Sequence, residues 1–71
     1  MITIETLYED QIETLKDINM FDKKVIYDSE ECVIIKWADT DGIVVYIPRD
    51  KEKDLLKLPE HIREKITKEM I

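Results

Sequence analysis

Residues 32–47 read CVIIKWADTDGIVVYI, and this stretch decides the fold. Two runs rich in Ile and Val flank a polar Asp-Thr-Asp-Gly segment, a pattern typical of two antiparallel strands joined by a tight turn. We therefore predict strands at residues 32–38 and 43–47. The turn also decides which face of the sheet is core, because a register change of one residue moves every side chain of a strand to the other face.

The apolar pattern favours a three-residue loop at residues 40–42. A two-residue turn would place Lys36 opposite Ile47 on an otherwise apolar face, whereas the longer loop pairs Ile35 with Ile47. Gly42, the single glycine of the chain, would then adopt the left-handed conformation. The predicted core face carries Val33, Ile35, Trp37, Ile43, Val45 and Ile47.

The opposite face of this predicted sheet is mixed but too apolar to stay comfortably in water. Two short helices cannot easily cover both faces. We expect this face either to contact a second copy or another protein, or to be covered by the C-terminal segment. Its residues are Cys32, Ile34, Lys36, Ala38, Val44 and Tyr46.

Helical periodicity precedes the sheet. It predicts a helix that begins at Thr3 or Thr6 and ends at Asn19, with Thr6 and Glu9 forming a capping box. The alternation of residues 2–4 is also compatible with a short strand. The apolar stripe of this helix consists of Ile4, Leu7, Tyr8, Ile12, Leu15 and Ile18.

The remaining elements are one strand and a helical C-terminal segment. A short strand is predicted at residues 24–27, and residues 28–31 form a polar turn. Asp50 caps a helix at residues 51–57, and Pro59 either starts a second helix or kinks the first. The apolar face of this segment carries Leu55, Leu58, Ile62, Ile66 and Met70.

These elements predict one small α+β domain over residues 1–71. Its order is an N-terminal helix, a three-stranded antiparallel β-meander and a C-terminal helix that is broken or kinked at Pro59, with the helices on one face of the sheet. A domain of 71 residues is marginally stable and needs an efficient core or a partner.

Composition narrows the classes of function. The net charge is −6, which disfavours nucleic acid as a partner and favours a protein with a basic surface. The chain contains one cysteine and no apolar run long enough to span a bilayer, so we expect a cytoplasmic protein that does not bind membranes.

The stretch WADTDGIVV resembles the first motif of the haloacid-dehalogenase-like phosphatases, an Asp-x-Asp-Gly after a hydrophobic strand. The resemblance implies that Asp39 is a nucleophile, that Asp41 is a general acid, and that magnesium binds nearby. It covers about nine residues, and Ile43 replaces the usual threonine. The doubly wound sheet, later lysine and second acidic pair of that family have no counterpart, so a minimal Asp-dependent enzyme is our third hypothesis, ranked below a binding module and a homodimer and above a nucleic-acid binder.

No other residues form a catalytic, metal or cofactor set. His61 is expected to be exposed near a helix start, and Cys32 lies in a strand rather than at the spacing of a metal ligand. A pairing of Cys32 with His61 for nucleophilic catalysis has no supporting motif. We therefore predict a protein that is not an enzyme and holds neither cofactor nor metal.

An acidic ridge lies on the solvent side of the first predicted helix, where Glu9, Glu13 and Asp17 recur four apart with Asp10 beside them. Such like charges destabilise a helix slightly, so the ridge is either a solvated face or a surface that meets a basic partner. We predict a small acidic binding module, with inhibition of a nucleic-acid-binding protein by charge mimicry as one mode of action. The alternative is a structural homodimer or assembly subunit that uses the exposed sheet face. The candidate contact residues are Glu9, Asp10, Glu13, Asp17, Ile34, Lys36, Val44 and Tyr46.

Overall fold

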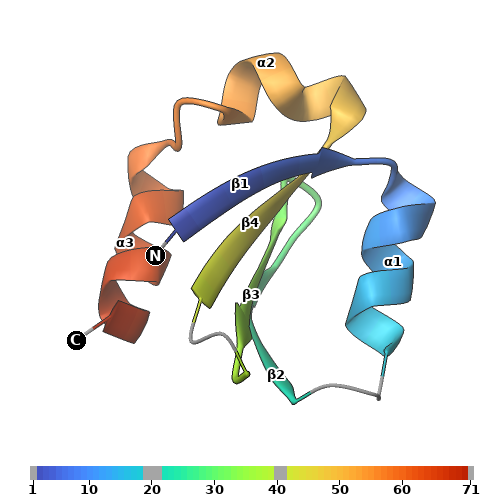
Figure 1. Ribbon diagram of the computed structural model, residues 1–71. Helices are drawn as coiled ribbons and strands as arrows, with labels where there is room; N and C mark the ends of the chain where they lie inside the picture. The colour runs from blue at the N-terminus through green and yellow to red at the C-terminus, as the bar shows by residue number, and fades with distance from the viewer. Residues whose placement is uncertain (1, 19–21, 40–41, 71) are drawn as a thin grey trace.

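The computed structural model describes residues 2–18, 22–39 and 42–70. Within these ranges the chain forms a four-stranded mixed sheet and three α-helices, which confirms the α+β class (Figure 1). The elements in chain order are β1 (Ile2–Leu7), α1 (Glu9–Asp17), β2 (Lys23–Asp28), β3 (Val33–Trp37), β4 (Gly42–Pro48), the 3-10 helix η1 (Arg49–Lys51), α2 (Glu52–Leu55) and α3 (Glu60–Met70).

The sheet contains one strand more than the predicted meander. Strands β2, β3 and β4 are antiparallel as expected, and β1 lies beside β4 in parallel, so the order is β1-β4-β3-β2. The predicted helix start at Thr3 or Thr6 is therefore wrong, and the alternative of a strand at residues 2–4 is right. The β-branched Ile and Thr residues favour a strand here, and Ile4 and Leu7 pack on opposite sides of the sheet.

Helix α1 is shorter than predicted because residues 2–7 are used in the sheet. It begins at Glu9, and its first turn is closed by Gln11, whose Oε1 accepts a hydrogen bond from the Tyr8 backbone N–H at 3.0 Å. The predicted box of Thr6 and Glu9 does not form, since Thr6 belongs to β1. Asn19, the predicted helix stop, lies outside the described residues, and α1 ends at Asp17.

The hairpin register also differs from the prediction. Trp37 opposes Gly42 and Ile35 opposes Val44, so residues 38–41 form the connection. Gly42 begins β4 and does not have a positive φ. Relative to the prediction, the pairing is shifted by an odd number of residues. Each side chain of β4 therefore lies on the opposite face, relative to β3, from the face predicted for it. Residues 40 and 41 of the predicted loop lie outside the described residues.

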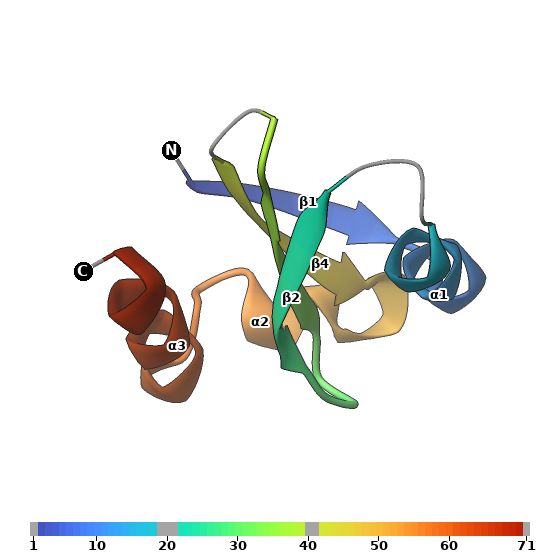
Figure 2. The same ribbon diagram turned by 90° about the horizontal axis from the view of Figure 1, so that it is seen from below.

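Matching apolar residues across the hairpin gave the wrong register because both faces of the sheet are apolar. Helices cover both faces, not one as predicted. Figure 2 shows α1 and α3 on opposite sides of the strands. The α3 side is a core of Cys32, Ile34, Ile43, Val45, Ile47, Leu55, Ile62 and Ile66. The α1 side is a smaller core of Ile12, Val33, Ile35 and Tyr46.

The proposed exposed sheet face is therefore not formed. Ile34 is 0% exposed on the α3 side, and Tyr46 is 5% exposed on the α1 side, where its hydroxyl accepts a hydrogen bond from Trp37 Nε1 at 3.0 Å. Lys36 and Val44 are half-buried and, like Ile34 and Tyr46, lie on opposite faces. A surface made of these four side chains together does not exist.

Pro59 separates two helices, which settles the alternative left open by the sequence. Its carbonyl accepts hydrogen bonds from Ile62 N–H at 3.0 Å and Arg63 N–H at 3.1 Å, so it starts α3. The predicted helix at residues 51–57 divides into η1 and α2. Leu58, between α2 and Pro59, has a φ of 53°. The predicted apolar face is confirmed at Leu55, Ile62 and Ile66, which are buried, and at Leu58, which is partly buried; the side chain of Met70 lies outside the described residues.

Candidate binding cleft

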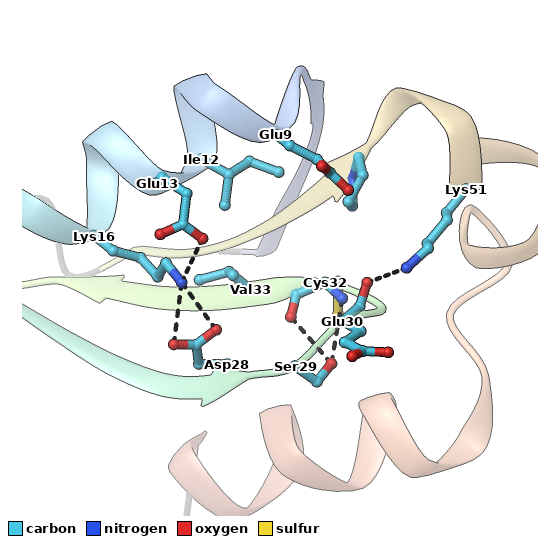
Figure 3. A pocket seen from close by; sticks show the side chains of 11 residues that line it. Glu9, Ile12, Glu13, Lys16, Asp28, Ser29, Glu30, Cys32, Val33 and Lys51 are labelled. Atoms are coloured by element: carbon cyan, nitrogen blue, oxygen red, sulfur yellow. Dashed lines mark hydrogen bonds and ion pairs between the residues drawn. The ribbon is translucent and has the colours of Figure 1, made fainter.

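A cleft of about 610 Å³ lies between α1 and the turn that joins β2 to β3 (Figure 3). It combines charged side chains at its mouth with an apolar floor. The lining residues are Glu9, Ile12, Glu13, Lys16, Asp28, Ser29, Glu30, Cys32, Val33, Pro48 and Lys51.

Four exposed carboxylates surround the cleft. Glu9 and Glu13 come from successive turns of α1, while Asp28 and Glu30 come from the end of β2 and the turn after it. The two segments are distant in the sequence, and the packing of α1 against the sheet brings them together. Because like charges gather at one opening, the cleft attracts cations.

Two lysines line the same cleft, and both are engaged by neighbouring groups. Lys16 Nζ lies 2.8 Å from Glu13 Oε1 and 3.2 Å from Asp28 Oδ1. The hydrogen bond with Glu13, helped by Asp28, raises the pKa of Lys16 against the opposing effect of its partial burial. Lys51 Nζ donates a hydrogen bond to the carbonyl oxygen of Glu30. Within the described residues, the Glu9 and Glu30 carboxylates have no ion-pair partner.

The floor of the cleft is apolar and is fixed by the turn after β2. Ile12, Val33 and Pro48 are buried beneath the carboxylates. Ser29 holds the turn in shape, since its Oγ accepts hydrogen bonds from the backbone N–H groups of Glu31 at 3.1 Å and Cys32 at 3.3 Å. A ligand in this cleft would therefore meet negative charge outside and apolar surface inside.

Cys32 also reaches this cleft but is only 1% exposed. Burial, helped by the charge of Glu31, raises the pKa of the Cys32 thiol to about 11. The thiol is therefore protonated at neutral pH, whereas a nucleophilic cysteine must be a thiolate. His61 is exposed, as predicted, and its Nε2 lies 2.9 Å from Glu31 Oε1.

The predicted acidic ridge is divided between the cleft and the open solvent. All four residues are exposed on α1, but Glu9 and Glu13 line the cleft, whereas Asp10 and Asp17 do not. Helical spacing turns Asp10 and Asp17 farther from the sheet.

Comparisons with protein-family models, with curated proteins and with solved structures find no match. Sequence reasoning missed Lys16, Asp28, Glu30 and Lys51 as members of this site. Residues 28–31 were recognised as a polar turn, but no sequence signal places that turn beside α1.

The Asp-x-Asp-Gly stretch lies apart from this cleft. Asp39 is exposed and follows β3, while Asp41 lies outside the described residues. The doubly wound parallel sheet of the phosphatase family is not present, because only β1 and β4 are parallel within the described sheet. Among the described residues, no group of three or more His, Cys, Asp or Glu side chains is placed to hold a metal ion. No described helix is long and apolar enough to cross a membrane.

Proposed function

We propose that this protein is a non-enzymatic binding module that receives a basic segment of another protein in the cleft between α1 and the β2–β3 turn. The observation that carries the proposal is the convergence of carboxylates from two distant segments, Glu9 and Glu13 on one side and Asp28 and Glu30 on the other, above an apolar floor. Four carboxylates outnumber two lysines there, and both lysines are already engaged.

The apolar floor favours a mixed segment over a purely ionic contact. A Lys or Arg side chain has an aliphatic stem that packs on apolar surface and a charged end that remains at the rim. In this arrangement the stem lies over Ile12 and Val33, and the charged end meets Glu9 or Glu30. The charged end stays solvated at the rim, where it contributes mainly to the rate and specificity of association, while the aliphatic stem contributes apolar contact with the floor.

We further propose that the partner is a nucleic-acid-binding protein. The acidic residues of the cleft and of α1 would then compete with nucleic-acid phosphates for the partner's basic surface. Support comes from the net charge of −6 and from the two further exposed carboxylates, Asp10 and Asp17, that the same helix carries outside the cleft. A basic groove that binds phosphates attracts such a surface by the same long-range electrostatics.

The test is fluorescence anisotropy with a labelled peptide of alternating arginine and leucine, measured at low and moderate salt. The double variant Glu9→Lys/Glu30→Lys should lose about tenfold in affinity, since two carboxylates at the mouth become repulsive. Neither residue is an ion-pair partner of Lys16, so the helix–turn contact is retained.

The matched control is Asp54→Lys/Glu64→Lys, which changes the net charge equally at exposed positions outside the cleft. It should bind the peptide almost as tightly as the original chain. Equal losses in both double variants would reduce the effect to net charge and contradict the cleft. Charge mimicry is tested by competition, because the protein and a single-stranded oligonucleotide should then displace each other from a basic nucleic-acid-binding domain. An absence of competition would contradict the mimicry.

A further inference from the structure

The two edges of the sheet differ in how they are protected against pairing. Edge strand β2 carries Lys23 and Lys24 and has a β-bulge between Val25 and Tyr27, which are common devices that prevent strand addition. Lys24 is also held by Glu69 of α3, with 3.2 Å between the charged atoms. This edge is therefore a poor template for another strand.

Edge strand β1 has none of these devices. Its sequence, ITIETL, contains no Lys or Pro, and its register with β4 is regular along all six residues. Ile2 is 40% exposed, Thr3 and Glu5 are exposed, and β1 pairs on one side only within the described sheet. A regular β-branched edge of this kind offers free backbone donors and acceptors to a further strand.

We propose that β1 pairs antiparallel with β1 of a second copy, so that two sheets join into one continuous sheet across a two-fold axis. The axis keeps like faces together, which requires even-numbered residues to oppose even-numbered ones. Ile2, Ile4 and Thr6 share the α3 side of the sheet with their β4 partners Ile43, Val45 and Ile47.

Charge selects one register among those allowed. A pairing centred on Glu5 would oppose two carboxylates directly, which is destabilising, and one centred on Thr3 would shorten the overlap. A pairing centred on Ile4 opposes Ile4 with Ile4 of the second copy, Thr3 with Glu5, and Ile2 with Thr6. The strand is thus complementary to itself on both faces, and this complementarity favours a second copy over an unrelated strand.

The proposed interface is small and separate from the cleft. No residue of β1 lines the cleft, so this inference does not rest on the proposed function. One strand per copy buries less than the roughly 1,200 Å² of stable interfaces, and the net charge of −6 on each copy opposes association at low salt. We therefore expect a reversible dimer that strengthens as salt is added.

Sedimentation velocity over about 5 to 500 µM protein in moderate salt is the first test. The mean mass should rise toward that of two chains. In parallel, hydrogen exchange should slow with protein concentration at those β1 amides that do not pair with β4, and not in β2. A monomer over the whole range, or protection confined to other segments, would overturn the proposal.

Charge changes at the paired positions test the register. Thr3→Glu places a carboxylate opposite Glu5 of the second copy at two symmetric positions and should weaken dimerisation about tenfold. Thr3→Glu/Glu5→Lys should restore it, because each new carboxylate then faces a lysine. Both variants should fold, since residues 3 and 5 are exposed, and circular dichroism checks this. A Thr3→Glu chain that dimerises normally, or a double variant without recovery, would rule out this register.

Discussion

The Cys32 thiol is an ionisable group held in its neutral form by burial, and this couples its titration to stability. Its pKa in the folded chain is about 11, against an ordinary value of 9.0. The unfolded chain therefore releases this proton first as the pH rises. We expect the free energy of unfolding to be unaffected by this group below pH about 9 and to fall as the pH approaches 11, as measured by urea unfolding.

The variant Cys32→Ala isolates this contribution. The interval from about pH 9 to 10 is the most informative, because the Tyr46 hydroxyl and the Lys16 ammonium, whose pKa values are also raised, begin to contribute only near and above their ordinary values of 10.0 and 10.5. Between about pH 9 and 10 the free energy of unfolding of Cys32→Ala should change little. Its value at neutral pH should be lower than that of the original chain, because the packing of the sulfur is lost. An unchanged slope in Cys32→Ala would mean that another group titrates.

At the scale of elements, the junction of α2 and α3 depends on an uncommon backbone conformation at Leu58. Its φ of 53° lies in the left-handed region, which costs a residue with a Cβ about 1–2 kcal/mol. Its N–H nevertheless bonds to Leu55 O at 3.0 Å, and its side chain packs on the α3 core. Tertiary packing thus selects a conformation that local sequence disfavours.

The positive φ of Leu58 predicts that glycine is more stabilising than alanine at this position, the reverse of their usual order in helices. Leu58→Ala and Leu58→Gly lose the same packing, but only glycine relieves the positive φ. We expect the glycine variant to be more stable than the alanine variant by about 1 kcal/mol in chemical denaturation, after allowing for its greater freedom when unfolded. At the exposed helical position Lys53, the same pair of substitutions should show the usual order, with alanine more stable. A more stable Leu58→Ala would contradict the assigned strain.

Elements with local signals were predictable from the sequence, and those defined by distant pairing were not. Helix α3 follows a clear period after Pro59, and β3 and β4 are dense in β-branched residues, so their types and most of their buried residues were correct. Residues 2–7 carry both signals, because Ile2 and Ile4 alternate as in a strand whereas Ile4 and Leu7 are spaced as on one helix face, and only pairing with β4 decides between them.

The register and the site failed for related reasons. Both faces of β3 and β4 are apolar, so matching apolar residues across the hairpin could not select one pairing. The acidic residues of α1 were recognised, and half of them line the cleft, but the opposite wall depends on the packing of α1 beside the β2–β3 turn. Three-dimensional proximity of this kind has no local signature.

For the whole molecule, the excess of acidic residues sets the response to salt. A net charge of −6 on 71 residues produces self-repulsion, which screening reduces. The ion pairs of Lys16 and Lys24 act in the opposite sense but involve exposed partners and contribute little. Raising sodium chloride from about 10 to 200 mM should increase Tm by about 2–5 °C in calorimetry.

The variant Glu9→Lys/Glu30→Lys supplies the comparison for this salt effect. It removes part of the excess negative charge and should therefore show a smaller rise in Tm over the same range. A Tm that falls with salt in the original chain would mean that the ion pairs outweigh the general repulsion.

The parallel pairing of β1 with β4 has a consequence for the newly made chain. Residues leave the ribosome from the N-terminus onward, so β1 emerges first, whereas β4 follows after α1, β2 and β3. At bacterial and eukaryotic rates of translation this interval is roughly 2–8 seconds, whereas a hairpin of β2 and β3 forms in microseconds. Of the four strands described, β1 is thus synthesised first and is among the last to enter the sheet. Until β4 is available, both edges of β1 are unpaired in the nascent chain.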